Sequence, residues 1–206
     1  MLRGRAIAVS LPEESGVRNA FIDILLDDCY GLDSMSEAST ILDVGANVGL
    51  FSLAARIAFP KATIHAYEPN SALESHLSTQ AAGAGLRYFL EAVGKEDGRV
   101  RLEVHDDSVQ TRSHRDPMGL VPQIAFRTAV ARLGGTVTLV KLDCEGAEWD
   151  LLGDYGTWHG VQRLVMEYHL WSAHTHGEAR MLVAALGFTV IKQEEPSDYG
   201  LLLARR

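Results

Sequence analysis

Apolar and polar residues along the chain follow two alternating periods. Short apolar runs flanked by turn residues predict buried strands, and apolar residues spaced three and four apart predict helices. The predicted strands occupy residues 40–44, 63–67, 87–93, 136–143, 163–169, 188–193 and 200–205. The predicted helices between them occupy residues 50–58, 71–82, 146–153 and 176–186. This alternation predicts an α/β fold with a mostly parallel sheet of seven strands and helices on both faces.

The two ends of the chain depart from this alternation. Only the loop "EEPSDYG", residues 194–200, separates the last two predicted strands, so we expect them to pair as an antiparallel hairpin. Residues 1–38 form an N-terminal preamble. Its apolar residues from Val17 and Phe21 onward recur at the intervals of a helix, and we expect this helix to cover the sheet. The whole chain, residues 1–206, is predicted to fold as a single domain.

Residues 98–127 interrupt the alternation of strands and helices. Their sequence predicts a short pair of strands around a polar loop. We interpret this insertion as a lid or substrate loop, because ligands of open α/β sheets bind beyond the carboxyl ends of the strands. Its side chains that are candidates for contact with a substrate are His105, Asp106, Asp107, Ser108, His114 and Arg115. The alternative is a solvated loop that contacts nothing.

The composition is that of an ordinary globular protein. Of the 206 residues, 47% are hydrophobic and 22% are charged, and the net charge of −8 argues against nucleic acid as the main partner. No apolar run reaches the length of a membrane span, and the N-terminus lacks the apolar core of a signal peptide. Two cysteines, Cys29 and Cys144, are too few for a disulfide framework. We therefore expect a cytoplasmic protein with no membrane partner.

A glycine turn joins the first predicted strand to the first helix of the alternation. The stretch "DVGANVG", residues 43–49, places Gly45 and Gly49 where the chain must turn sharply and where a ligand approaches the main chain. Backbone N–H groups at the start of the next helix bind anionic groups. A tight structural turn is the alternative. The glycine spacing differs from the dinucleotide pattern G-x-G-x-x-G, which argues against a nicotinamide cofactor.

An acidic residue follows the second predicted strand. Glu68, in "YEPN", lies nineteen positions after Gly49, where an acid accepts hydrogen bonds from the hydroxyls of a ribose. A solvated strand end is the alternative. The third strand ends in "LEAVG", where Glu91 and Ala92 are placed to border an adenine ring.

These residues together resemble the cofactor site of class I S-adenosylmethionine-dependent methyltransferases, which have a Rossmann-like fold ending in an antiparallel hairpin. The resemblance implies that the glycine turn passes beneath the methionine end of S-adenosylmethionine, that Glu68 holds its ribose and that Asp43 organises the turn. The cofactor-binding residues so implied are Asp43, Gly45, Ala46, Asn47, Gly49, Glu68, Pro69, Glu91, Ala92 and Asp143.

A second stretch is more specific. "LVKLDCEGAEWDLL", residues 139–152, resembles the signature of the FkbM-type methyltransferase family, and "EYH" at 167–169 is similar to the Glu-x-His of that family. The residues that match the signature are Lys141, Asp143, Glu145, Gly146 and Glu148. The sequence departs from the family at "RTAVARLGG", residues 127–135, which lacks the usual acid. The resemblance implies a methyltransferase whose acceptor is a small molecule, natural product or sugar.

The catalytic residues predicted from these motifs are Asp143, Glu145 and His169. Asp143 ends the fourth strand and His169 ends the fifth, so both are expected at the edge where the transferred methyl group lies. A histidine there has an ordinary pKa near neutrality and is a credible base for a hydroxyl acceptor, which favours O-methylation. Glu148 is interpreted as a structural residue that ties down Lys141.

Several alternatives stay open at this point. N-methylation on the same fold and a non-catalytic module that only binds S-adenosylmethionine are both compatible with the motifs. No metal site is assigned. The side chains of Asp143, Glu145, Glu167 and His169 would hold a divalent cation only if they converge at coordination distance, and the sequence does not show whether they do.

Overall fold

Seven strands form the main sheet of the computed structural model, which describes residues 7–206 apart from the side chain of Ser172. Their order is β10-β11-β9-β8-β1-β2-β3. Their bounds are Thr40–Val44 for β1, Thr63–Tyr67 for β2, Arg87–Phe89 for β3, Leu139–Leu142 for β8, Arg163–His169 for β9, Thr189–Glu194 for β10 and Tyr199–Arg205 for β11. Only β11 runs antiparallel to its neighbours in this sheet of the described chain. The predicted parallel sheet with a C-terminal hairpin is confirmed.

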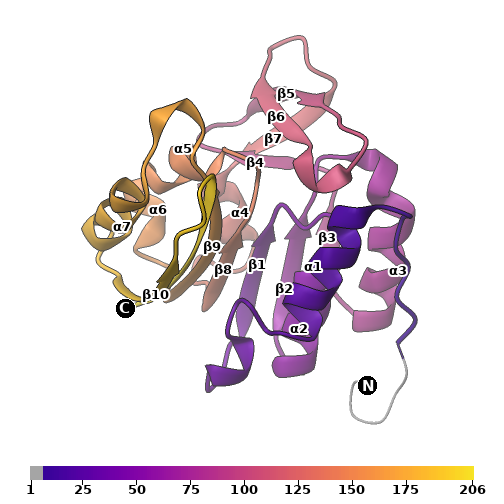
Figure 1. Cartoon of the computed structure of the whole chain (residues 1–206), viewed down its shortest axis with the longest axis horizontal. Coiled ribbons are helices and arrows are strands. Elements are labelled where there is room, and N and C mark those ends of the chain that lie inside the picture. The colour runs from indigo at the N-terminus through magenta and orange to yellow at the C-terminus, as the bar shows by residue number, and fades with distance from the viewer. Residues whose placement is uncertain (1–6) are drawn as a thin grey trace.

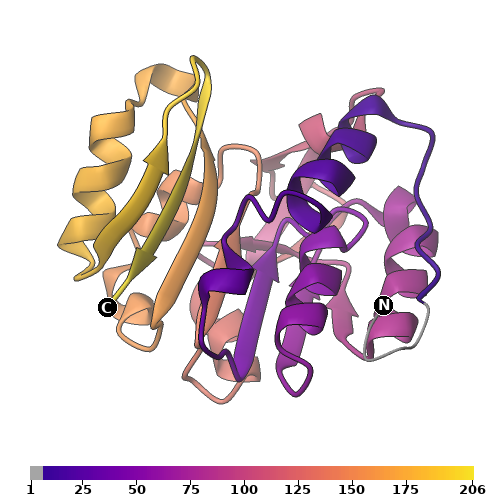
Figure 2. The ribbon, with the colours of Figure 1, turned by 60° about the horizontal axis from the view of Figure 1, so that its bottom comes forward.

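Helices cover both faces of this sheet, as predicted (Figures 1 and 2). One face is covered by α1, Ser15–Leu25, α2, Leu50–Ala58, and α3, Glu74–Ala84. The other face is covered by α4, Phe126–Arg132, α5, Glu148–Leu152, α6, Tyr155–Trp158, and α7, His176–Ala185. Short 3-10 helices lie at Leu32–Ser34 (η1), Ser71–Leu73 (η2), Ser108–Gln110 (η3) and Trp171–Ala173 (η4).

The side chains of β1 show how the alternation of a strand builds both layers. Leu42 and Val44 point into the layer of α4 to α7 and are buried there. Ile41 points to the opposite face and packs with Phe51 of α2. Asp43, two positions after Ile41, faces the same helix and is completely buried. A carboxylate is thus placed inside the core at the carboxyl end of the sheet.

Two helical predictions need correction. The sequence predicted no helix at 126–132, where α4 lies with Phe126, Ala129 and Val130 buried. The single helix predicted at 146–153 begins later, at Glu148, and a separate short helix, α6, follows it. The helix predicted at 71–82 begins as η2 and continues as α3.

A second, four-stranded sheet lies beyond the carboxyl ends of β1 and β2, at the top of Figure 1. Its order is β4-β7-β5-β6, with β4 at Ala92–Gly94, β5 at Gly98–Glu103, β6 at Arg112–Arg115 and β7 at Val121–Ala125. The strand predicted over 87–93 was wrong, because the chain bends after Phe89 and its second half joins this other sheet. The pair of strands predicted within 98–127 is a set of three.

The segments before the main sheet contact this second sheet. Asp107 accepts a hydrogen bond from the backbone N–H of Gly16 at 2.7 Å, and Ser108 N–H donates to Glu14 Oε2 at 2.6 Å. The described part of the predicted preamble therefore joins the second sheet at the cavity, and residues 1–6 of that preamble lie outside the described residues. None of the helices in residues 7–206 has the length and apolar character needed to cross a membrane.

Candidate active site

A cavity of about 520 Å³ lies at the carboxyl ends of β1, β2, β8 and β9. It is lined by all three predicted catalytic residues, Asp143, Glu145 and His169. Most predicted cofactor residues also line it, namely Gly45, Ala46, Asn47, Glu68, Pro69, Glu91, Ala92 and Asp143. Asp43 and Gly49 lie behind its wall, so any influence they have on a ligand is exerted through the turn.

The glycine turn has three residues in the left-handed backbone region. Gly45 has φ of 75°, Asn47 of 49° and Gly49 of 88°. A Cβ added to Gly45 would lie 1.7 Å from the backbone oxygen of Asp143. From the sequence we explained this glycine by a sharp turn and by the approach of a ligand. The positive φ agrees with the turn, and the structure adds a further reason, since the loop after β8 occupies the space that a side chain would need.

A buried aspartate, a buried lysine and a partly exposed aspartate connect β1 to β8. Ser52 Oγ donates to Asp43 Oδ2 at 2.7 Å, and Lys141 Nζ lies 3.5 Å from Asp43 Oδ1 and 3.3 Å from Asp143 Oδ2. Lys141 also donates to the carbonyl oxygen of Gly45 at 2.5 Å. Lys141 thereby fixes the glycine turn and the start of the loop after β8 to each other.

These buried charges shift one another's protonation. Burial raises the pKa of Asp43 above its ordinary value, against the opposing effects of Lys141 and Ser52. Burial alone lowers the pKa of Lys141, but the attraction of Asp143 and Asp43 outweighs it and leaves that pKa above its ordinary value. Lys141 is therefore charged and serves as a fixed cation at the base of the cavity.

Glu68 is fixed by the backbone on both sides of its carboxylate. Oε2 accepts from the N–H of Asn47 and Oε1 accepts from the N–H of Asn70, each at 2.8 Å. Burial raises the pKa of Glu68 to about 7, and these two hydrogen bonds oppose the shift. Glu68 is buried and lines the cavity. Glu68 is thus not a solvated strand end.

Glu91 lies at the bend between β3 and β4. Arg132 of α4 forms an ion pair with it at 2.5 Å, and the guanidinium of Arg132 lies over the ring of Phe89, 4.8 Å from its centroid. Phe89 stacks on Tyr67, which lines the cavity. The unpredicted helix α4 therefore supplies the cation that positions Glu91.

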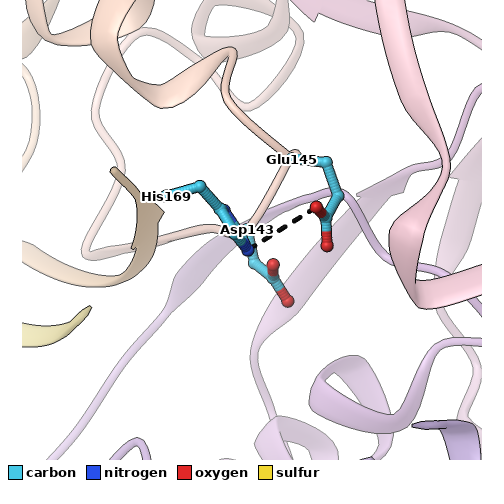
Figure 3. Close-up of side chains that lie close together, drawn as sticks. All are labelled: Asp143, Glu145 and His169. Atoms are coloured by element: carbon cyan, nitrogen blue, oxygen red, sulfur yellow. Dashed lines mark ion pairs between the residues drawn. The ribbon is translucent and has the colours of Figure 1, made fainter. Parts of the chain in front are cut away.

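The acidic residues Asp143 and Glu145 and the imidazole of His169 lie close together (Figure 3), and all three line the cavity. Asp143 and Glu145 come from the loop after β8 and His169 from the end of β9. One ligand-type atom from each of these three side chains lies within 4.8 Å of the other two. The parallel pairing of β8 with β9 brings them together, as the sequence predicted from the two strand ends.

Glu148 has a different role from the predicted one. Its Oε1 accepts from the N–H of Cys144 at 2.6 Å, and its Oε2 accepts from the N–H of Gly146 at 2.8 Å. Lys141, to which we expected it to bind, is held by Asp43 and Asp143 instead. Glu148 therefore shapes the loop that carries Glu145, whose own φ is 53°.

The crowding of carboxylates changes the protonation of this group. Burial raises the pKa of Glu145 and of Glu167 to about 8 in each case. Burial alone lowers the pKa of His169, but the attraction of Glu148 and Glu145 raises it to about 9. From the sequence we expected the pKa of His169 to lie near neutrality. In the protein as described, the surrounding acids keep the imidazole protonated at neutral pH.

The second sheet and η3 cover the cavity both near the acidic residues and at the glycine turn. The guanidinium of Arg112, on β6, lies 3.5 Å from the ring centroid of Trp171, and Ser108 accepts a hydrogen bond from Asn47 Nδ2 at 3.1 Å. Six loop residues were proposed to contact a substrate. All six lie in the described part of the chain, and only Ser108 among them lines the cavity. His114 and Arg115 instead form exposed ion pairs with glutamates.

Sequence reasoning missed several residues that line the cavity. Arg112 gave no signal, because its contact with Trp171 depends on how two distant segments meet. Asn19 and Asp23 of α1 also line the cavity, on the polar side of a helix predicted only to cover the sheet. The buried position of Lys141 was signalled by its place within an apolar strand, "LVKL", where a charged residue needs a partner.

Comparison with known proteins decides the family. Residues 43–190 match the methyltransferase FkbM domain. The chain belongs to this family.

Relatives of this family member include named methyltransferases. It is 26% identical over 208 residues to Methyltransferase 1 of Beauveria bassiana, covering 82% of this chain and 79% of that protein. It is also 26% identical over 216 residues to 31-O-demethyl-FK506 methyltransferase FkbM of Streptomyces tacrolimicus, covering 84% and 82%. The family resemblance inferred from the motifs is confirmed.

Solved structures support the same fold. Magnesium protoporphyrin IX methyltransferase (ChlM) from Synechocystis PCC 6803 with bound SAH has a TM-score of 0.58 at 12% identity, covering 96% of this chain and 90% of that one. The same protein with bound SAM has a TM-score of 0.56 at 12% identity, covering 100% and 88%. The fold is that of class I methyltransferases. As a family member, this protein is an S-adenosylmethionine-dependent methyltransferase.

Proposed function

We propose that this protein methylates a hydroxyl group of a small molecule, natural product or sugar, and that its cavity holds the cofactor at the glycine turn and the acceptor at the acidic end. The observation that carries the proposal is the convergence of Asp143, Glu145 and His169 on the wall of a cavity that Glu68 also lines. With the ribose at Glu68, these side chains are the groups left to meet the acceptor where the methyl group is transferred.

The residues at the turn fit S-adenosylmethionine. A volume of about 520 Å³ lies within the range of small-molecule sites, and the buried carboxylate of Glu68 supplies acceptor lone pairs for two ribose hydroxyls. The adenine edge would be bordered by Glu91 and Ala92. When bound, the cofactor supplies an electrophilic methyl group on a positively charged sulfur.

The acidic end fits an acceptor that must lose a proton. As the S–C bond breaks and the O–C bond forms, the acceptor oxygen gains the methyl group and its proton leaves. Positioning of the acceptor and removal of this proton are what the protein contributes. Asp143, Glu145 and His169 all line the cavity, and the carboxylates of Asp143 and Glu145 are partly exposed. The protonated imidazole of His169 orients the hydroxyl, and a carboxylate beside it receives the proton.

Charge at the acceptor end disfavours an anionic acceptor. Asp23, Glu167 and Asp198 line the same end of the cavity as Asp143 and Glu145. These acids attract a neutral or a cationic molecule, so a protonated amine is the second candidate acceptor and N-methylation the second candidate reaction. The name of the Streptomyces relative, a 31-O-demethyl-FK506 methyltransferase, supports a hydroxyl acceptor.

The unpaired thiols of Cys29 and Cys144 support a cytoplasmic location as part of this proposal.

A pair of matched acceptors separates the two reactions. The protein is incubated with radiolabelled S-adenosylmethionine and either an alcohol or the amine of the same carbon skeleton, over a set of sugar and polyketide-like compounds. The proposal expects label on the alcohols. Label on the amines alone would show that the protein catalyses N-methylation and not O-methylation. Calorimetry with S-adenosylhomocysteine and with NAD⁺ gives the binding control, and binding of the cofactor without transfer to any acceptor would favour the non-catalytic module.

A further inference from the structure

The acidic end of the cavity has an arrangement that proton transfer alone does not require. Asp143, Glu145 and His169 project from two neighbouring strand ends toward a common point (Figure 3). Their ligand-type atoms lie within 4.8 Å of one another. Ligands of one ion at about 2.2 Å lie at most about 4.4 Å apart, so a small rotation of the carboxylates brings all three into coordination range.

These side chains contact one another only through long ion pairs. His169 Nε2 lies 3.6 Å from Glu145 Oε2 and 3.7 Å from Glu167 Oε1, and Nδ1 lies 3.7 Å from Glu148 Oε1. All three separations are too long for hydrogen bonds. The imidazole is 10% exposed, and its Nδ1 has no hydrogen-bond partner among the described residues. A buried imidazole that makes no hydrogen bond to the acids around it leaves room for a further ligand between them.

The charges around this point do not balance. The acids that face it are Asp143, Glu145, Glu148 and Glu167. Apart from the imidazole of His169 itself, the nearby cations are already engaged, since Lys141 binds Asp43, Asp143 and the carbonyl of Gly45, and Arg112 stacks on Trp171. Carboxylates at such close range repel one another unless further positive charge lies among them.

We propose that Asp143, Glu145 and His169 bind one divalent metal ion. Two carboxylate oxygens and one imidazole nitrogen form a mixed donor set that suits Mn²⁺ or Zn²⁺ better than Mg²⁺, which prefers oxygen ligands. Asp143 keeps its contact with Lys141 through one oxygen and presents the other to the ion. Three protein ligands leave coordination positions open toward the cavity.

The consequence for the reaction rests on the proposed function. An acceptor hydroxyl that occupies an open position loses its proton more readily, because a bound cation lowers the pKa of a coordinated oxygen. Glu167, which lies beside His169 and lines the cavity, is the carboxylate left to take that proton. In this arrangement His169 is a ligand and Glu167 the proton acceptor.

The test measures metal binding directly. The purified full-length protein, stripped with a chelator, is titrated with MnCl₂ while free Mn²⁺ is followed by electron paramagnetic resonance. The inference expects one saturable site, weakened by about tenfold or more in each of Asp143→Asn, Glu145→Gln and His169→Ala. Glu103→Gln is the matched control, because Glu103 is an exposed acid beside two histidines, His105 and His114, and its loss should leave the site unchanged.

Thermal unfolding of the same proteins checks folding. Mn²⁺ should raise the Tm of the wild type and of Glu103→Gln but not that of the three ligand variants. The inference is overturned if the wild type shows no saturable site, or if the three variants bind Mn²⁺ as the wild type does. S-adenosylhomocysteine is titrated in parallel without metal. If the protein binds S-adenosylhomocysteine but not Mn²⁺, the metal site is rejected and the proposed function stands. If it binds Mn²⁺ but not S-adenosylhomocysteine, the proposed function is rejected.

Discussion

The two ends of the cavity are built in opposite ways. At the cofactor end, Glu68 accepts two backbone hydrogen bonds of 2.8 Å, and Asp43 accepts one of 2.7 Å from Ser52. At the acceptor end, His169 and its neighbouring carboxylates lie 3.6–3.7 Å apart and form no hydrogen bond among the described residues. The carboxylates of the first end are held by short hydrogen bonds, although Asp43 Oδ1 accepts none among the described residues, whereas the imidazole of the second end is held only by longer ion pairs.

This difference indicates that the two ends have different functions. A preorganised carboxylate such as Glu68 binds a ligand without having to be ordered first, so changes there should alter cofactor affinity. The unpaired acids and imidazole act on a group that is present only during turnover, so changes there should alter the rate. The two ends meet at Lys141 and Gly45, through which a change in one end reaches the other.

The largest effect is expected at the acceptor end. We predict that His169→Ala lowers kcat by about 10²–10⁴-fold, the range for losing one group of an acid–base site, because the imidazole orients the acids that receive the acceptor's proton, while the Kd of S-adenosylhomocysteine stays nearly unchanged. Turnover and calorimetry on the same preparation check this. His65→Gln is the control, since His65 is equally buried but does not line the cavity. Equal losses of kcat in both variants would contradict a specific role for His169.

The link between the two ends is broken by Gly45→Ala. The new Cβ would overlap the backbone oxygen of Asp143, so we expect the free energy of unfolding to fall by more than about 3 kcal/mol. Gly134→Ala is the matched control. Gly134 has φ of 88° and open space around it, so this variant should lose only the backbone strain of about 1–3 kcal/mol. Chemical denaturation measures both, and equal losses would mean that the overlap with Asp143 is relieved cheaply.

The cofactor end is tested by Glu68→Gln. Loss of hydrogen bonds from ribose hydroxyls to a charged carboxylate should weaken S-adenosylhomocysteine binding by about 1.5–3 kcal/mol. The change should be smaller in Glu91→Gln, because the carboxylate of Glu91 is held by Arg132 at the edge of the cavity. Calorimetry gives both values. A Kd that is unchanged in Glu68→Gln would return Glu68 to a purely structural role in the turn.

The smallest effect is a pH dependence of cofactor affinity. Burial raises the pKa of Glu68 to about 7, with Lys141 lowering it and Asp43 raising it. Ribose hydroxyls donate to the ionised form, so below this pKa binding must release a proton. Affinity should therefore be level above the pKa and fall by at most about tenfold per pH unit as the pH drops below it. Glu68→Gln should remove this slope, and an identical slope in that variant would assign it to another group.

Sequence patterns predicted the cofactor end well because its residues are close together in the chain. The turn at Gly45 and the acid at Glu68 follow adjacent parallel strands, and each strand has a clear apolar pattern. The mostly parallel direction of the main sheet and its C-terminal hairpin follow from the same patterns. Asp43 and Gly49 were placed at the cofactor on resemblance, and the structure puts both behind the wall of the cavity.

The second sheet and the acceptor end were harder to predict for physical reasons. Nothing between Phe89 and Ala92 breaks a strand, so the bend that sends β4 into the other sheet is visible only in three dimensions. Helix α4 did carry a signal in the spacing of Phe126, Ala129 and Val130, but a single repeat over two turns is weak. The pKa of His169 depends on carboxylates from two separate strand ends, so its direction could not be derived from the sequence.

A crystal structure of the complex with S-adenosylhomocysteine tests the central claim most directly. The account predicts that both ribose hydroxyls donate to the carboxylate of Glu68 and that the sulfur lies at the end of the cavity formed by Asp143, Glu145 and His169. The contradicting result is a ligand bound the other way round, with its sulfur beside Glu91 and its ribose among the acids of β8 and β9.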